Sequence, residues 1–106
     1  MKEYHKLIRD KIPEIMEKSG KAFKVRRLND EEVILFAEKK LSEELGEYLA
    51  DRNPEELADL LEVMEALVRA RGFDWDTLLK LKDDKKAARG GFEKRILLLD
   101  IQTGQH

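Results

Sequence analysis

Four acidic residues form two pairs on either side of a short break in the sequence, and their types and spacing could do chemistry. Glu44 and Glu47 are three positions apart, as are Glu56 and Asp59. The two pairs are symmetric about the break at residues 51–54, so in an antiparallel helical hairpin Glu47 is level with Glu56 and Glu44 with Asp59. Carboxylate oxygens are the ligands that a hard divalent cation prefers. The spacing therefore predicts a site for a cation such as Mg²⁺.

Two helices joined by a tight turn must position these acids. Apolar residues recur at helical spacing on both sides of the break. They are Leu41, Leu45, Tyr48 and Leu49 before it, and Leu57, Leu60, Leu61, Met64 and Val68 after it. Asn53 is a favourable N-cap and Pro54 suits the first helical position, so a new helix is predicted to start there. So short a connection makes the helices antiparallel neighbours.

The acids do not belong to the main apolar stripe of either helix, yet their own ridges are partly apolar. The ridge of Glu44 continues backwards through Phe36, and the ridge of Asp59 continues forwards through Val63. Residues three and four apart share one side of a helix. We therefore expect the four carboxylates to converge at the rim of a core.

The motifs resemble those of the MazG-like all-α nucleoside triphosphate pyrophosphohydrolases. The signature E-E-x-x-E followed by E-x-x-D reads here Glu43-Glu44-x-x-Glu47 and Glu56-x-x-Asp59. The opening YHKLIRDKIPEI and the late stretch RGGFEKRILL are similar to short phosphoribosyl-ATP pyrophosphohydrolase-like members, so the resemblance covers nearly the whole chain.

The resemblance implies a catalytic and metal-binding role for the four acids, with Mg²⁺ as the cofactor. The metal ligands and catalytic residues would be Glu44, Glu47, Glu56 and Asp59. The implied reaction is hydrolysis of a nucleoside triphosphate, with a non-canonical, house-cleaning nucleotide as one option, to the monophosphate and pyrophosphate. Two alternatives stay open: a phosphoribosyl-ATP pyrophosphohydrolase of histidine biosynthesis, and a non-catalytic helical dimerisation or regulatory module.

Basic residues are candidates for binding the substrate phosphates. Lys40 shares the ridge of Glu44, so an ion pair with Glu44 is favoured over a phosphate contact. A later helix carries a basic stripe, which is either a phosphate-binding surface or a solvated face; its members are Lys82, Lys85, Lys86 and Arg89. The run Arg9-Asp10-Lys11 is either near the active site or a self-paired surface run. Other acids are interpreted as solvated helix surface: Glu43, Glu55, Glu62 and Glu65.

The remaining pattern predicts a mainly α fold, with the antiparallel hairpin inside a small helical bundle. Helices are expected from Pro13 to Gly20, from Asn29 or Asp30 to about Ala50, and onward from Asp74 or Asp76. A minor two-stranded β element is an option, in which residues 21–28 pair with a buried apolar run at residues 96–99. The whole of residues 1–106 is expected to form one domain.

Composition narrows the class of protein. The 106 residues are 42% charged and 42% hydrophobic, with a net charge of −2 and no cysteine. This balance gives no indication of a nucleic acid polymer or an anionic membrane as partner, and cysteine chemistry is excluded. No apolar run approaches a membrane span and no signal peptide is evident, so a cytoplasmic location is expected.

Successive apolar residues at 34–36 face more than one direction on a helix, which favours a homodimer or homotetramer.

Overall fold

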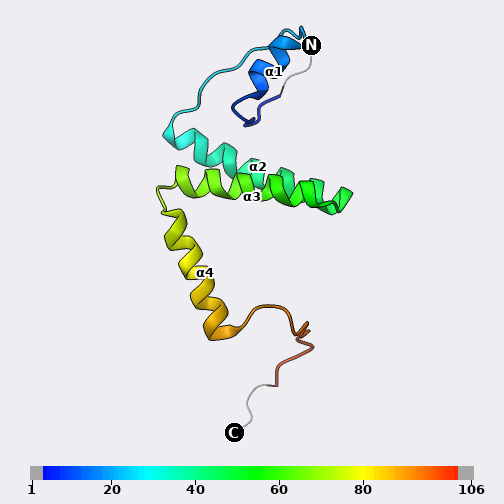
Figure 1. The fold of residues 1–106 in the computed structure, drawn as a ribbon, viewed down its shortest axis with the longest axis vertical. Helices are drawn as coiled ribbons and strands as arrows, with labels where there is room; N and C mark the ends of the chain where they lie inside the picture. The colour runs from blue at the N-terminus through cyan, green and yellow to red at the C-terminus, as the bar shows by residue number, and fades with distance from the viewer. Residues whose placement is uncertain (1–3, 103–106) are drawn as a thin grey trace. The chain divides into compact units, whose positions relative to one another are not determined.

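The computed structural model describes residues 4–102, and within that range the protein is mainly α-helical (Figure 1). Its helices are α1 (Ile12–Lys18), α2 (Asp30–Asp51), α3 (Pro54–Ala70) and α4 (Trp75–Arg89). The fold class is therefore confirmed. No strand occurs among residues 4–102, and the two segments considered for a strand pair, 21–28 and 96–99, are irregular.

The described residues fall into two compact units that divide between Trp75 and Asp76. The first unit holds α1, α2 and α3, and the second holds most of α4 and the segment that follows it. The expectation of one domain over the whole chain stays a prediction.

Both long helices begin at asparagine caps, as the sequence predicted. Asn29 Oδ1 accepts a hydrogen bond from the backbone N–H of Glu32 at 2.8 Å, and Glu32 Oε1 accepts one from the Asn29 N–H at 3.1 Å. Asn53 Oδ1 accepts a hydrogen bond from the backbone N–H of Glu56 at 3.1 Å, and Pro54 follows as the first residue of α3. These side chains satisfy N–H groups that have no partner inside the helix.

The turn between α2 and α3 consists of two residues. Arg52 adopts a left-handed conformation with φ 60°, and its N–H donates to the Tyr48 carbonyl at 2.7 Å, which ends α2. Asn53 then caps α3. Because the turn is so short, α3 returns antiparallel along α2 and packs against it.

The buried part of the hairpin lies on the ridges that carry the acids. Ala37 is fully buried, Val63 is 9% exposed and Glu44 is 5% exposed, and no other residue in the range 4–102 is classed with them. Ala37 lies on the same ridge of α2 as Lys40 and Glu44, and Val63 lies on the same ridge of α3 as Asp59. The expectation that the acids lie at the rim of a covered, partly apolar face is met at Glu44.

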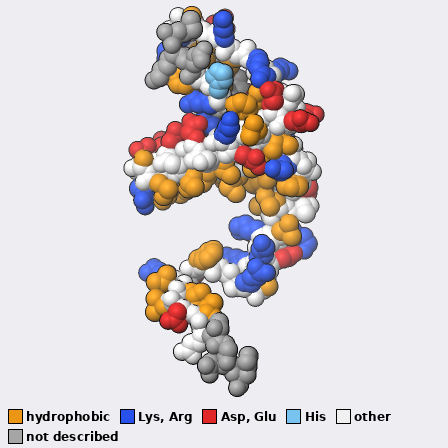
Figure 2. All heavy atoms as spheres, turned by 180° about the vertical axis from the view of Figure 1, so that it is seen from behind, with side chains coloured by type: hydrophobic (Ala, Val, Ile, Leu, Met, Phe, Trp, Pro, Cys, Tyr) orange, Lys and Arg blue, Asp and Glu red, His pale blue; other side chains and the backbone are white. Residues whose placement is uncertain are grey.

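The main apolar stripe of the hairpin is exposed in the single chain. We call it the apolar face; its members Leu45, Leu49, Leu57, Leu61 and Met64 are 40–54% exposed. Figure 2 shows hydrophobic side chains gathered along one side of the hairpin and acidic ones along the other. A shallow groove of about 400 Å³ runs into this face, lined by Glu38, Leu41, Ser42, Leu45, Leu60 and Met64.

The second unit places its apolar run in solvent. Ile96, Leu97, Leu98 and Leu99 are 70–84% exposed, and Phe92 is 96% exposed. The prediction that residues 96–99 are buried is therefore wrong for the single chain, because the described part of this unit has α4 as its one helix and no residue of α4 is buried. No helix among the described residues is long and apolar enough to cross a lipid bilayer.

Candidate metal centre

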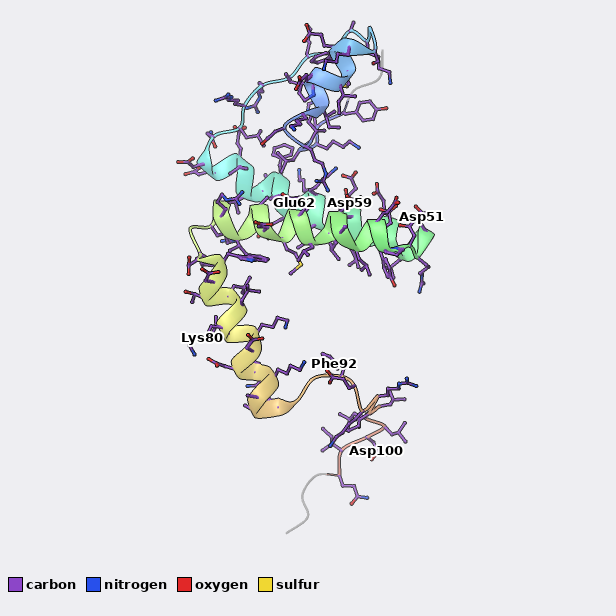
Figure 3. All side chains as sticks on the ribbon, viewed as in Figure 1. Asp51, Asp59, Glu62, Lys80, Phe92 and Asp100 are labelled. Carbon is purple, nitrogen blue, oxygen red and sulfur yellow. The ribbon has the colours of Figure 1, made fainter. Side chains whose placement is uncertain are left out.

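The acids of the two hairpin helices meet around one residue, Glu44. One carboxylate oxygen from each of Glu44, Glu56 and Asp59 lies within 4.8 Å of the others, and the same holds for Glu43, Glu44 and Glu47. Figure 3 labels Asp59 on α3, on the side of the hairpin where acids gather. We call these five residues the acid cluster. Both predicted pairs belong to it, and Glu44 is common to its two halves.

Glu44 gives this cluster an unsatisfied ligand atom. Its side chain is 7% exposed, and its Oε1 lies 3.3 Å from Lys40 Nζ. Its Oε2 is buried and has no hydrogen-bond partner in the described part of the chain. A buried carboxylate oxygen without a donor is costly, and a cation nearby removes that cost. Each half of the cluster offers one oxygen from each of three acids, and Glu44, which both halves share, has a buried and unpaired oxygen. This set of oxygen ligands fits a hard divalent cation such as Mg²⁺.

Two acids of the cluster bind protons more tightly than ordinary glutamates. In its protonated form Glu47 donates a hydrogen bond to Glu44, which raises the pKa of Glu47, and burial and the negative charge of Glu44 add to the effect. Burial raises the pKa of Glu56, and a hydrogen bond with Asp51 adds to it. Repulsion between carboxylates favours the protonated form. A bound cation would reverse this preference because it stabilises the ionised form.

Three basic side chains of the first unit approach the acid cluster. Lys40 Nζ lies 3.6 Å from Glu43 Oε1 in addition to its contact with Glu44, so the ion pair favoured from the sequence is present. Lys6 Nζ lies 3.3 Å from Glu43 Oε1. Arg9 Nη2 donates to Asp59 Oδ1 at 2.7 Å.

The three residues of the run Arg9-Asp10-Lys11 differ in whether they contact the acid cluster. Arg9 contacts the acid cluster through Asp59. Asp10 is exposed, and Lys11 is exposed at the N-cap of α1. A place beside the acids is therefore assigned to Arg9 alone among these three residues.

The basic stripe of α4 lies in the second unit, where all its members are exposed. Lys82 Nζ is 3.7 Å from Asp83 Oδ1, and Lys86 Nζ is 3.4 Å from Glu93 Oε1. Lys85 and Arg89 complete the stripe. Local acids relieve part of its charge, and its role in binding phosphate stays a prediction.

Two residues at the cluster were not identified as functional from the sequence. Glu43 was interpreted as solvated surface, but it shares the cluster with Glu44 and Glu47. Its i,i+4 spacing to Glu47 is the signal that could have placed it there. Lys6 was not singled out, and its contact with Glu43 spans 37 positions, which no local pattern reveals.

No protein-family model matches this sequence, and neither a curated protein nor a solved structure matches it. The interpretation of the site therefore depends on its own geometry and on the motifs described above.

Proposed function

We propose that the protein is a Mg²⁺-dependent nucleoside triphosphate pyrophosphohydrolase of the MazG-like kind that its motifs resemble. It hydrolyses a nucleoside triphosphate to the monophosphate and pyrophosphate. The observation that carries this proposal is the buried, unpaired Oε2 of Glu44 at the point where acids from two helices meet. Buried polar atoms are normally paired, so an unpaired one among clustered acids supports a ligand at this place.

The residues that would hold the metal are Glu44, Glu47, Glu56 and Asp59. Bound Mg²⁺ would supply positive charge that offsets the negative charge developing on the phosphoryl oxygens. Lys40 fixes the position of Glu44 through its 3.3 Å ion pair. One of the four carboxylates, in place of binding the metal, would accept the proton of the attacking water.

Water attacks phosphorus directly in this proposal. The chain contains no cysteine to act as a covalent nucleophile. It also lacks the G-x-x-x-x-G-K-[ST] loop that serves γ-phosphate transfer in many nucleotide hydrolases. Basic residues would hold the leaving pyrophosphate, and Lys40 is the candidate for this role beside the acids.

The proposal includes a homodimer or homotetramer in the cytoplasm. Within residues 4–102 the buried apolar residues of the single chain are Ala37 and Val63, which is a very small core. The apolar face, 40–54% exposed at its five residues, lies on the hairpin and would be covered by the same face of a second copy. Such pairing is self-complementary, as a twofold interface requires.

An assay of products tests the proposed reaction. Purified protein is incubated with Mg²⁺ and a panel of canonical and non-canonical nucleoside triphosphates, with phosphoribosyl-ATP included, in ¹⁸O-labelled water. We expect monophosphate and pyrophosphate, with the label in one of these two and none in orthophosphate. Glu56→Gln should abolish turnover, whereas the control Glu62→Gln, a change on an exposed side chain of the same helix, should retain it.

Other products would refute the proposal. Nucleoside diphosphate and orthophosphate as first products would exclude cleavage between the α- and β-phosphates. Turnover of phosphoribosyl-ATP alone would identify the histidine-biosynthesis enzyme. Absence of any Mg²⁺-dependent turnover across the panel would favour a non-catalytic dimerisation or regulatory module.

A further inference from the structure

Two basic side chains reach the acid cluster from the segment that precedes α1. Lys6 contacts Glu43 on α2, 37 positions later, and Arg9 contacts Asp59 on α3, 50 positions later. Each helix of the hairpin therefore receives one cation from the same short segment. Asp59, the partner of Arg9, is one of the acids that would hold the metal, and Glu43, the partner of Lys6, belongs to the same acid cluster.

These ion pairs are easily exchanged. The side chains of Arg9 and Asp59 are 56% and 42% exposed, and those of Lys6 and Glu43 are 43% and 31% exposed. An exposed ion pair contributes little to stability because water competes for both partners. The contact with Asp59 uses one nitrogen of Arg9, Nη2, whereas a guanidinium offers five N–H donors in a planar fork.

We propose that Lys6 and Arg9 bind the phosphate groups of the substrate, and that Arg9 exchanges Asp59 for phosphate when the acid cluster takes up its cation. This inference rests on the proposed function. A divalent cation at the cluster competes with Arg9 for Asp59, because both are attracted to the same carboxylate. The released guanidinium then forms paired N–H···O bonds with a phosphate group, for which its shape is suited.

The exchange predicts that Arg9→Gln lowers the affinity for a phosphate ligand without lowering the affinity for the cation. Arg9→Gln removes a competitor of the cation, so Mn²⁺ alone should bind as tightly as to the unchanged protein, or up to about fivefold more tightly. The same substitution removes a phosphate ligand. Affinity for methylenediphosphonate, a pyrophosphate mimic with a carbon bridge, should fall by about tenfold or more in saturating Mg²⁺.

Arg71 provides a matched control in the same unit. Its Nη2 lies 2.7 Å from Glu38 Oε2, the same distance as in the Arg9–Asp59 pair, and the two side chains are 44% and 45% exposed. Arg71→Gln removes the same charge from a similar ion pair. It should leave both affinities unchanged. Lys6→Gln should lower affinity for methylenediphosphonate without weakening Mn²⁺ binding.

The experiment uses the full chain, with Mn²⁺ binding followed by electron paramagnetic resonance and methylenediphosphonate binding by calorimetry. Weaker Mn²⁺ binding by Arg9→Gln, or unchanged methylenediphosphonate binding by both Arg9→Gln and Lys6→Gln, would overturn the inference while the metal centre stands. If Arg9 only stabilises the fold, Arg9→Gln should weaken Mn²⁺ binding and also lower the unfolding temperature. If the unchanged protein binds no Mn²⁺, the proposed function fails as well.

Discussion

At the scale of single residues, Glu44 joins the two halves of the acid cluster. It is buried with Ala37 and Val63 on the ridges where α2 and α3 pack, and one of its oxygens is paired with Lys40 while the other is not. Burial fixes the position of this carboxylate, and the more exposed acids around it can adjust. A rigid ligand with adjustable neighbours is suited to a site that binds metal and substrate together.

Replacing one acid of the cluster should separate metal binding from folding. We expect Glu47→Gln and Glu56→Gln each to abolish Mg²⁺-dependent turnover, with metal-free stability equal to or higher than that of the unchanged protein, because one of several repelling carboxylates is gone. The unchanged protein should gain about 2.7 kcal/mol in Mg²⁺ at about 100 times its Kd. Both variants should lose this gain in thermal unfolding. Near-normal turnover in either variant would show that the ligands are misassigned.

Stability should depend on pH with opposite slopes above and below the ordinary glutamate pKa of 4.5. Because the pKa of Glu47 and Glu56 is raised, the folded chain binds more protons than the unfolded chain, so metal-free stability falls as the pH rises from 4.5 through the raised values. The Arg26 guanidinium lowers the pKa of Glu32 to about 2, so its stabilising contribution is present above 4.5 and is lost as the pH falls toward about 2.

Unfolding temperatures measured in a chelator across this range check both slopes. Glu47→Gln should flatten the decline above 4.5. Glu32→Gln should flatten the decline below 4.5 and retain its helix cap, because glutamine also serves in a capping box. Identical profiles for the two variants and the unchanged protein would contradict the assignments.

The acids could be predicted from the sequence because their spacing is local. Positions three apart on a helix, mirrored about a short turn, place Glu44, Glu47, Glu56 and Asp59 together without further information. The contacts of Lys6 and Arg9 could not be predicted in the same way. They depend on how an irregular segment lies against the hairpin, and no periodicity specifies that.

At the scale of elements, asparagine caps made the starts of the two hairpin helices predictable. Asn29 and Asn53 have side chains that accept N–H groups of the first turn, and Pro54 begins α3. The optional strand pair had only an alternating pattern in its favour. Strands need a partner for their main-chain groups, and an isolated pair is at best marginally stable. Residues 21–28 and 96–99 accordingly remain irregular.

The cap of α3 should influence the metal centre as well as the helix. Asn53→Ala removes the acceptor of the Glu56 N–H and should lower the free energy of unfolding by about 1 kcal/mol. Because Glu56 is in the turn that the cap orders, Mn²⁺ affinity should also fall. Urea unfolding and Mn²⁺ titration measure the two effects.

Asn29→Ala is the matched control for this prediction. It removes the corresponding cap at the start of α2, which lies four helical turns before Glu44. It should lower stability by a similar amount and leave Mn²⁺ affinity unchanged. Equal losses of Mn²⁺ affinity in both variants would mean that general stability, not the position of Glu56, controls binding.

At the scale of the whole molecule, the exposed apolar face predicts self-association. Light scattering at micromolar concentration should give two or four chains per particle. Leu61→Glu introduces a charge on this face and should shift the particle toward the monomer, because burying an unpaired charge is costly. Leu81→Glu makes the same change on α4 at a residue that is also 54% exposed, and it should not dissociate the particle.

A stable monomer of the unchanged protein at micromolar concentration would refute self-association. Dissociation by Leu81→Glu alone would place the contact on α4 instead of the apolar face. The first unit has a very small core without a partner, so Leu61→Glu should also lower the unfolding temperature.

Titration of Mn²⁺ into the metal-free protein tests the central claim most directly, because it needs no knowledge of the substrate. Electron paramagnetic resonance should show Mn²⁺ binding to the unchanged protein and to Glu62→Gln. Glu44→Gln should bind at least about tenfold more weakly, since it replaces the buried ligand shared by both halves of the cluster. Binding of equal strength in Glu44→Gln, or no binding to the unchanged protein, would contradict the assignment of the acid cluster as a metal centre.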